Sequence, residues 1–318
     1  MKSAVSDCRY TKRPDIISFA IVICHTLLVF APVYLAAVVS FWWLPLCWFT
    51  FGFLMNGLLN LMHEAAHYHI FQWRKANDII GRWFLGPLAV TDFDAYRQRH
   101  WDHHRYLGET TDPKVTYHQD VRGRRMLFHI MSCLLLREAW LKFQHQHKAQ
   151  AKESSTGSST TWMIRTMLVQ LLFATSLFGM ALIAHPIGLG PAFIGATTTY
   201  MVVYIYGLGS LTVLAANIRA IAEHQIDTND DIHEGMAALR NLPCNFLTRL
   251  CFGAYGFGEH ATHHAQPAVP YYHLPKTTAT MAKRDPRLAP ADGYLITLWR
   301  LIWRPSPSVS SNLDVTTV

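Results

Sequence analysis

The chain has 318 residues, of which 51% are hydrophobic and only 15% are charged. Soluble domains carry roughly 25% charged residues, so this composition argues against a soluble protein and favours a membrane protein. The net charge of +7 does not indicate a nucleic-acid-binding protein, because all 28 Lys and Arg lie outside two uncharged runs, at residues 16–62 and 166–218.

Each uncharged run is long enough for two membrane-spanning helices of about 20 residues. The first run predicts spans over about 16–39 and 46–62, joined by a turn in which Trp42 and Trp43 suit the membrane interface. The second predicts spans over about 162–184 and 192–216, joined by an uncharged turn rich in Gly and Pro. We therefore expect an all-α polytopic protein with four transmembrane helices in two hairpins and a helical cytosolic cap.

The membrane domain is predicted to be single and to cover residues 16–304. A polar arm at residues 1–15 precedes it, and residues 305–318 have the composition of a disordered tail. The first apolar run is too long for a cleavable signal. All basic residues fall on one side of a two-hairpin topology, so the positive-inside rule places both termini and the site in the cytosol. We expect a bacterial inner membrane in preference to the endoplasmic reticulum, and the six unpaired cysteines indicate free thiols.

The segment between the predicted hairpins, residues 68–165, contains three distinct stretches. Residues 79–90 are apolar apart from Arg82 but too short to span, so they are expected in the membrane interface or as a re-entrant segment. Residues 126–144 read as one amphipathic interfacial helix. Residues 148–161 are rich in Ser, Thr and Lys and predict a flexible linker.

Three histidine motifs stand out among the 18 histidines of the chain. The first has two histidines four residues apart, which places them about 40° apart on one helical face. The second and third each read H-x-x-H-H, so that their imidazoles can converge when the segment is helical. We name them the first, second and third histidine boxes, and their eight members are His63, His67, His100, His103, His104, His260, His263 and His264.

Eight imidazoles in three clusters at ligand spacing indicate a metal centre. Neutral imidazole binds Fe, Zn, Cu and Ni. Eight or nine nitrogen donors are too many for one ion, so two ions are expected. Iron is the best choice if the chemistry involves O₂, because iron changes redox state and zinc does not.

Two other classes of protein remain open from the residues alone. The first box also reads His63-Glu64-x-x-His67, the motif of zinc metalloproteases, in which Glu64 would be the general base. An intramembrane protease would leave the second and third boxes without a role, because a catalytic zinc needs three protein ligands. A metal transporter would need ionisable residues within the spans, where the chain offers essentially only His25.

The order of the three boxes on a four-span scaffold resembles the integral-membrane fatty acid desaturase superfamily, which includes hydroxylases and carotenoid ketolases. The resemblance extends over about residues 46–276 and is closest in the stretch that begins at His260 and ends at Pro275. It implies a further histidine ligand after the fourth span, which His224 matches, and hence nine ligands to two irons. In some relatives a nearby Asn contacts the site through water, and Asn217 is a possible equivalent on the same helical face as His224.

Residues beside the boxes are candidates for supporting roles. Asp102, Glu223 and Glu259 each neighbour a ligand and could accept a hydrogen bond from an imidazole, although a solvated charge at a helix end is an equal alternative. Arg97, Arg99 and Arg105 flank the second box and could bind an acidic headgroup, a carrier phosphate or the bilayer surface, or simply follow the positive-inside rule. The histidines expected not to be ligands are His69, His118, His129, His145, His147, His233 and His273.

The resemblance implies an O₂-dependent oxidoreductase that introduces a double bond into a fatty acyl lipid or thioester. A hydroxylase or ketolase acting on a lipid or carotenoid is the alternative within the superfamily. Two electrons would come from a separate carrier of the ferredoxin or cytochrome type and its reductase, because the chain contains no recognisable haem domain. An apolar tunnel between the spans is the expected means of holding one C–C bond at the metal.

Overall fold

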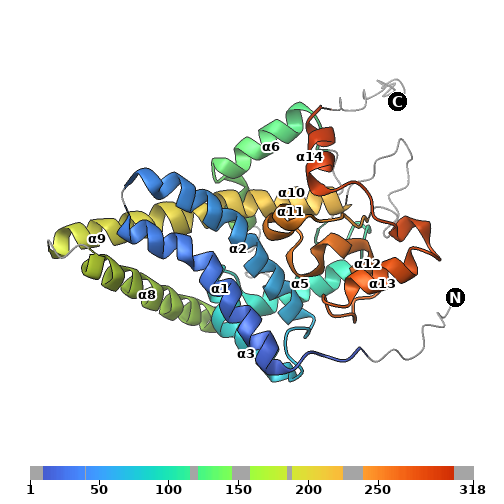
Figure 1. Cartoon of the computed structure of the whole chain (residues 1–318), viewed down its shortest axis with the longest axis horizontal. Helices are drawn as coiled ribbons and strands as arrows, with labels where there is room; N and C mark the ends of the chain where they lie inside the picture. Colours follow the sequence, from blue (N-terminus) through green and yellow to red (C-terminus); the bar gives the residue numbers. More distant parts are fainter. Residues whose placement is uncertain are drawn as a thin grey trace, which may run out of the picture.

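The structure, a computed structural model, describes residues 10–39, 41–114, 121–144, 158–184, 188–224 and 239–303. Within these ranges the chain forms helices, turns and loops, and its only β-type pairing is one isolated bridge between Asn241 and Pro290. The prediction of an all-α protein is confirmed (Figure 1).

Four helical stretches are long and apolar enough to cross a membrane. The first is α1 (Asp15–Val38), and the second joins the short η1 (Phe41–Trp43) to α2 (Leu44–Ala66). The third is α8 (Ser158–Ala184). The fourth runs without a break through α9 (Leu189–Thr198), η4 (Thr199–Tyr206), η5 (Leu208–Thr212) and α10 (Val213–His224), with η4 and η5 in π-helical geometry. Four candidate membrane-spanning helices are therefore present, as predicted, whereas their arrangement as two transmembrane hairpins stays a prediction.

The fourth stretch is longer than a membrane requires. Its 36 residues extend about 54 Å at 1.5 Å per residue, whereas the hydrocarbon core of a bilayer is about 30 Å thick. Its last turns must therefore project beyond the bilayer if the rest spans it. Its final residue is His224, and the second stretch carries His63 in its last turn in the same way.

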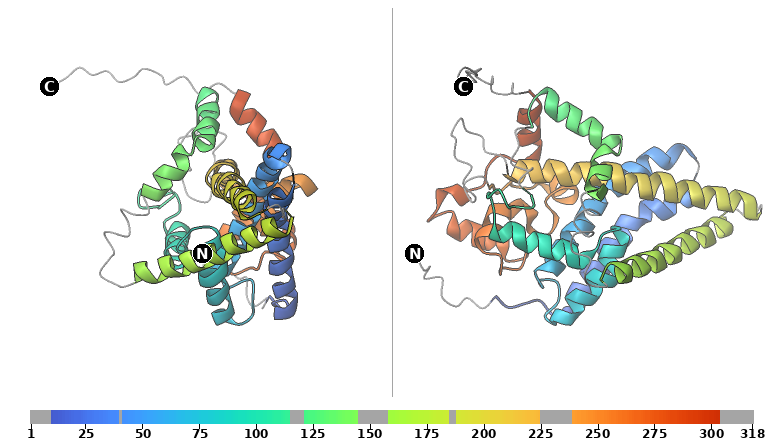
Figure 2. Two further views of the ribbon diagram at one scale, coloured as in Figure 1. Left: turned by 90° about the vertical axis from the view of Figure 1, so that its left-hand side faces the viewer. Right: turned by 180° about the vertical axis from the view of Figure 1, so that it is seen from behind.

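The long helices pack closely through small residues. α1 packs along α2, α8 packs along α9, and α2 packs along η4 and η5 (Figures 1 and 2). A Cβ added to Gly52 of α2 would lie 2.3 Å from Leu211 Cβ, and one added to Gly207 would lie 2.8 Å from the ring of Phe51. Glycine at these two crossings lets the backbones approach, as is common where helices pack within membranes.

Residues 74–105 form a helical layer against α2 and α8. This layer consists of α3 (Arg74–Ile80), η2 (Gly81–Leu85), α4 (Gly86–Leu88) and α5 (Phe93–Arg105). The Tyr204 hydroxyl donates to the Leu88 carbonyl at 2.8 Å, and Gln170 Nε2 donates to the Pro87 carbonyl at 2.9 Å. The side chain of Asp92 caps α5 by accepting from the backbone N–H groups of residues 94 and 95. The second histidine box thus lies on a capped helix.

The predicted single helix over 126–144 is wrong, because the chain bends in the middle of it. α6 (Arg124–Leu134) ends before Leu136, whose φ of 62° lies in the left-handed region, and a second helical stretch covers 137–144. Helices tolerate a left-handed non-Gly residue only at a break. The Tyr206 hydroxyl donates to the Leu134 carbonyl at 3.0 Å and so satisfies one of the acceptors freed at the end of α6.

The C-terminal part forms a compact group of short helices. It contains α11 (Phe246–Cys251), η7 (Ala254–Glu259), α12 (His260–Ala265), α13 (Leu274–Met281), η8 (Pro286–Leu288) and α14 (Tyr294–Trp303). α5, α12 and α13 gather at the end of the bundle opposite the place where α8 meets α9 (Figures 1 and 2). The predicted tail at 305–318 and most of the predicted linker lie outside the described residues, although residues 158–161 of that linker belong to α8.

The described part of the N-terminal arm lies across the loops that follow the first and third boxes. Lys12 Nζ donates to the Tyr68 carbonyl at 2.8 Å, and the backbone N–H of Arg13 donates to the Tyr272 hydroxyl at 2.9 Å. The Arg13 guanidinium lies 4.2 Å from the centre of the Tyr272 ring. The arm therefore connects the loop after the first box to the loop after the third box.

Candidate metal centre

The structure brings all nine predicted ligands into one buried cluster. The last turn of α2 and the residue that follows it supply the first box. α5 supplies the second box, α12 supplies the third box, and the last residue of α10 supplies the ninth histidine. The nine are His63, His67, His100, His103, His104, His224, His260, His263 and His264, and all but the partly buried His104 are fully buried.

The ring nitrogens divide into two groups that could each hold a metal ion. We name the first the five-histidine group, and its members are His63, His67, His100, His104 and His263. We name the second the four-histidine group, in which His224 lies within ligand distance of both His103 and His264 and, separately, of His260. In the five-histidine group, one candidate ligand atom per residue lies within 4.8 Å of all the others. The four-histidine group combines two sets with the same spacing: His103, His224 and His264 form one, and Glu223, His224 and His260 form the other.

The second and third boxes are split between the two groups in opposite ways. On α5, His100 and His104 belong to the five-histidine group and His103 to the four-histidine group. On α12, His260 and His264 lie in the four-histidine group, while His263 joins the five-histidine group. Residues i and i+4 lie about 40° apart on a helix, and residue i+3 points about 60° to the other side. Each H-x-x-H-H helix therefore directs a pair to one group and a single imidazole to the other.

Imidazole nitrogens approach each other closely in the five-histidine group. The Nε2 atom of His100 lies 2.7 Å from that of His67 and 3.0 Å from that of His104. His104 Nε2 in turn lies 3.2 Å from His263 Nε2. Several ring nitrogens of this group are buried without a hydrogen-bond partner among the described residues: His63 Nε2, His67 Nδ1, His100 Nδ1 and His263 Nδ1.

The four-histidine group is oriented by hydrogen bonds at the outer ring nitrogens. His103 Nδ1 lies 2.9 Å from Asp112 Oδ1, and His224 Nδ1 lies 2.8 Å from the Ala220 carbonyl. These acceptors require that both Nδ1 atoms carry the proton, which leaves both Nε2 atoms with a lone pair. The two Nε2 atoms nevertheless face each other at 3.3 Å, and His260 Nε2 lies 3.3 Å from that of His224.

This donor set fits a bound cation. Two lone pairs that face each other at 3.3 Å repel, whereas a cation shared between them turns the same arrangement into ligation. Burial, followed by the charge of neighbouring groups, lowers the pKa of His67, His100 and His263 well below the ordinary value of 6.5 and that of His104 to about 3. These lowered pKa values favour the neutral imidazole, which is the form that binds metals.

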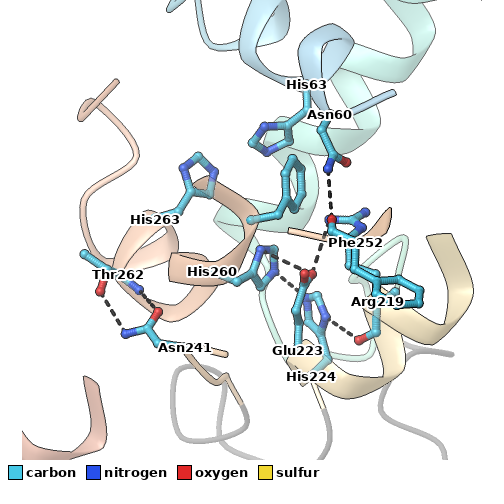
Figure 3. A network of polar contacts seen from close by, with 12 residues as sticks. Asn60, His63, Arg219, Glu223, His224, Asn241, Phe252, His260, Thr262 and His263 are labelled. Atoms are coloured by element: carbon cyan, nitrogen blue, oxygen red, sulfur yellow. Dashed lines mark hydrogen bonds and ion pairs between the residues drawn. The ribbon is translucent and has the colours of Figure 1, made fainter. Parts of the chain in front are cut away.

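Glu223 connects the four-histidine group to the C-terminal helices (Figure 3). Its Oε1 accepts from the Tyr294 hydroxyl at 2.7 Å, and its Oε2 lies 3.2 Å from the Arg219 guanidinium and 3.5 Å from His260 Nδ1. The carboxylate is fully buried but is shared by these three donors. Its contact with His260 Nδ1 gives it the supporting position that the sequence suggested.

Two carboxylates that orient histidines were missed by the sequence analysis. Glu64 Oε1 lies 2.9 Å from His63 Nδ1, and its Oε2 lies 3.2 Å from His69 Nδ1. Asp112 contacts His103 and also accepts from the backbone N–H of Lys114 at 2.7 Å. Glu64 was considered only as a protease base, and Asp112 lies in a polar turn with no spacing signal. The signal that could have found both is general: a buried ligating imidazole needs an acceptor for its other nitrogen.

Buried amides hold the third box against α2. Asn56 Nδ2 donates to the Cys251 carbonyl at 2.9 Å, and Asn60 Nδ2 donates to the carbonyls of Phe252 at 3.1 Å and Ala254 at 3.0 Å (Figure 3). Asn241 accepts from the backbone N–H of Thr262 at 3.1 Å and donates to the hydroxyl of the same residue at 2.9 Å. These bonds satisfy backbone groups that a buried loop would otherwise leave unpaired, and so they fix the position of the box.

Three predicted supporting residues make no contact with the nine clustered histidines among the contacts of the described residues. Asp102 lies on the half-exposed side of α5, and Glu259 is half-buried beside Arg249. The Asn217 side chain faces α6 and the following helical stretch, where it lies 3.1 Å from His129 Nε2 and accepts from Lys142 Nζ at 2.6 Å. Their proposed roles stay predictions.

The described histidines expected not to be ligands have other partners. His69 contacts Glu64, His129 contacts Asn217, and His273 Nε2 donates to the Thr11 carbonyl at 3.2 Å. The remaining ones fall outside the described residues: His118, His145, His147 and His233. Among the flanking arginines, Arg97 pairs with Asp78 at 2.7 Å and lies over the rings of Phe93 and Tyr68. Arg105 lies over the Tyr106 ring, and Arg99 lies between these two on α5.

Four apolar helices and two converging imidazole groups define a membrane protein with a histidine-rich metal centre. A family model described as fatty acid desaturase matches residues 40–294 of the chain. The chain belongs to this family of oxidoreductases, for which iron is the typical metal. Family membership argues against the zinc protease.

Similar proteins include desaturating and ketolating enzymes. Dihydrorhizobitoxine desaturase of Bradyrhizobium elkanii is 27% identical over 276 residues, which is 83% of this chain and 75% of that protein. Beta-carotene 4-ketolase of Protosiphon botryoides is 34% identical over 70 residues, 21% of this chain and 18% of its own length. Beta-carotene ketolase of Haematococcus lacustris is 34% identical over 58 residues, 18% of each chain. The similarity to the ketolases is therefore local.

Proposed function

We propose that the chain is an O₂-dependent di-iron desaturase that introduces a double bond into a fatty acyl chain. The observation that carries the proposal is the convergence of nine histidines, whose ring nitrogens approach one another in two groups. The overall reaction removes two hydrogens from adjacent carbons and, with two further electrons and two protons, reduces O₂ to two waters. Iron supplies the oxidising power that amino-acid side chains lack.

The residues of the chain hold, orient and shield this chemistry. The nine imidazoles would ligate the irons. Glu64, Asp112 and Glu223 would each accept a hydrogen bond from an Nδ1 proton, those of His63, His103 and His260 respectively, which leaves Nε2 of these rings for the metal. Burial of the whole cluster excludes water, so that O₂ is reduced beside the acyl chain and not in solution. The two electrons come from a separate ferredoxin or cytochrome and its reductase.

The proposed location follows from the charge distribution. Both termini and the metal centre face the cytosol, and the membrane is a bacterial inner membrane. Reporter fusions at residue 186 and at the C-terminus should give opposite signals, and matching signals would contradict a four-span topology.

A hydroxylase or ketolase acting on a lipid or carotenoid is the second candidate, and the local similarity to two beta-carotene ketolases favours it. Expression in a host that supplies a compatible reductase, followed by mass spectrometry of lipids, acyl thioesters and added β-carotene, separates the two. A product that has lost two hydrogens supports the desaturase, and one that has gained oxygen supports the alternative. Metal analysis should find two irons per chain, whereas one zinc without iron would revive the protease.

A further inference from the structure

One tryptophan of α5 connects the five-histidine group to the surface of the protein. The ring centre of Trp101 lies 4.7 Å from that of His67 and 5.8 Å from that of His104, and both histidines belong to the five-histidine group. Trp101 is nevertheless 38% exposed. A single exposed apolar side chain is ordinary on a protein surface. Trp101 is distinguished by its direct contact with two predicted metal ligands.

The face of α5 around Trp101 is polar. Arg97 and Arg105 lie four residues before and after Trp101, and therefore on the same side of the helix. Gln98 and Arg105 are exposed, and Arg97 is half-buried. Two guanidinium groups beside the ring do not suit the hydrocarbon core of a bilayer. We name Arg97, Gln98, Trp101 and Arg105 the Trp101 surface.

Further positive charge gathers beside this surface at Tyr68, the residue that follows the first box. The guanidinium groups of Arg74 and Arg97 lie 4.9 and 4.4 Å from the centre of the Tyr68 ring, and Lys12 Nζ donates to the Tyr68 carbonyl. Seven Lys and Arg, but only three Asp and no Glu, belong to the three segments that meet here: residues 10–15, 68–78 and 97–105. The surroundings of Trp101 are therefore basic.

The proposed function needs two electrons from a separate protein, and the burial of the ligands limits where that protein can approach. Electron tunnelling through protein slows steeply with distance, so the carrier must dock close to the metal. All nine predicted ligands are buried except His104, which is partly buried. Trp101 spans this barrier, because its ring contacts His67 and His104 while part of the same side chain remains accessible to a partner.

We infer that the Trp101 surface is the docking site for an acidic one-electron carrier protein of the ferredoxin class. This inference rests on the proposed function. Acidic groups on the carrier are attracted to the surrounding Lys and Arg, and Trp and Arg are residue types enriched among the anchors of protein interfaces. Electron-transfer complexes need only a small interface. Two reduced carriers dock in succession, each loses one electron, and the two irons pass from Fe(III) to Fe(II). Trp101 is neither oxidised nor reduced, but it shortens the gap that each electron crosses.

Binding of a plant-type [2Fe–2S] ferredoxin to the iron-loaded chain in nanodiscs of neutral lipid tests the docking site. Trp101→Ala should weaken binding about tenfold or more, as expected for an anchor residue. Arg105→Glu should slow association and reduce its dependence on salt. Trp299→Ala should leave binding unchanged, because Trp299 is 63% exposed on α14 and makes no ring contact with a described histidine.

Stopped-flow oxidation of reduced ferredoxin tests the electron route separately from docking. Trp101→Phe keeps an aromatic ring beside His67 and should accept electrons at nearly the unmodified rate. Trp101→Ala should be slower even when ferredoxin saturates the protein, which a loss of docking alone would not produce. Dithionite should deliver two electrons per chain to both variants, and this control excludes a damaged metal centre as the cause.

Hydroxyl-radical footprinting shows what covers Trp101. The residue should be oxidised in nanodiscs without ferredoxin and protected when ferredoxin is added. Protection by anionic lipid in the absence of ferredoxin would show that the bilayer covers this surface, and it would overturn the inference. Unchanged binding and unchanged reduction rates in Trp101→Ala and Arg105→Glu would overturn it as well. A protein that binds ferredoxin and is reduced as predicted, yet oxidises no acyl substrate, would support the docking site and count against the desaturase.

Discussion

The two histidine groups differ in how their imidazoles are held. In the four-histidine group, His103, His224 and His260 each have a protein acceptor beside Nδ1, namely Asp112, the Ala220 carbonyl and Glu223. In the five-histidine group, the described residues provide such an acceptor only for His63, through Glu64. Three of the four imidazoles in the four-histidine group are oriented by the protein before a metal binds, and His264 is the exception. The five-histidine group has more ligands but less support for each.

The comparison indicates that affinity for a metal can be increased either by adding ligands or by orienting the ligands that are present. A pre-oriented imidazole loses little freedom on binding, and its acceptor increases its basicity. An additional imidazole adds a bond but must be ordered by the metal itself. Removal of one ligand or one acceptor should therefore affect the two groups unequally, and the predictions below test this.

The largest effect is expected from His224→Ala. His224 lies between the other members of the four-histidine group, so its loss removes the imidazole that both sets share. We expect turnover to be abolished and iron to fall from two per chain towards one, while the protein still inserts in the membrane.

His129→Ala is the matched control, because His129 is half-buried beside Asn217 and belongs to neither group. His145→Ala and His147→Ala, which the sequence also predicts to be harmless, affect positions outside the described residues. Near-normal turnover and full iron in His224→Ala would contradict the ligand assignment.

A smaller effect is expected from Asp112→Asn and Glu223→Gln. Each removes the carboxyl group that contacts Nδ1 of a histidine in the four-histidine group. Loss of such a partner typically costs 10–100-fold in metal affinity or activity, so we expect a loss of that order in iron affinity. Titration of iron into the metal-free variants measures it. Asp102→Asn and Glu259→Gln serve as controls, because neither carboxylate contacts a described histidine, and equal losses in the controls would remove the basis of the comparison.

A still smaller effect is expected from Glu64→Gln. His63 would lose its acceptor, but four other imidazoles remain in the five-histidine group. We expect less than about tenfold loss of iron affinity at this group, by comparison with the usual range. A loss larger than that of Asp112→Asn would show that ligand number does not compensate for weaker orientation.

The smallest effect concerns pH and a histidine outside both groups. Burial, opposed by Glu138 and supported by Lys142, lowers the pKa of His129. The unfolded chain therefore takes up a proton at this residue first as the pH falls below about 6.5, and stability decreases. His129→Gln removes this cost. The Tm of the variant minus that of the unmodified protein should therefore increase as the pH is lowered from 7.5 to 5.5. A constant difference would show that His129 titrates alike in both states.

The clustering of the box histidines could be predicted from the sequence because their spacing is a local property. Histidines at i, i+3 and i+4 mark a helix that presents imidazoles, and this rule needs no tertiary information. The four apolar stretches are likewise a matter of composition. His224 came only from the resemblance to a family, because one histidine at a helix end has no spacing signal.

The division into two groups and the supporting contacts could not be predicted in the same way. Helix geometry separates His103 from the pair His100 and His104, but the position of each face depends on how α5 and α12 pack. The contact between Asp112 and His103 depends on the turn that follows α5. Likewise, the break at Leu136 interrupts a continuous amphipathic pattern, and the Tyr206 hydroxyl that bonds the Leu134 carbonyl beside it comes from a distant helix.

The split of the boxes sets a condition on the order of biosynthesis. His63 and His263 belong to the same group but are about 200 residues apart, so at 5–20 residues per second the ribosome needs roughly 10–40 s to make the second after the first. The four-histidine group likewise waits for His264. Neither histidine group is complete until the third box has left the ribosome, and on the proposed function metal loading would therefore follow translation of nearly the whole chain. A chain truncated before residue 260 would contain the five histidines of the first two boxes but none of the third, so neither group could be complete.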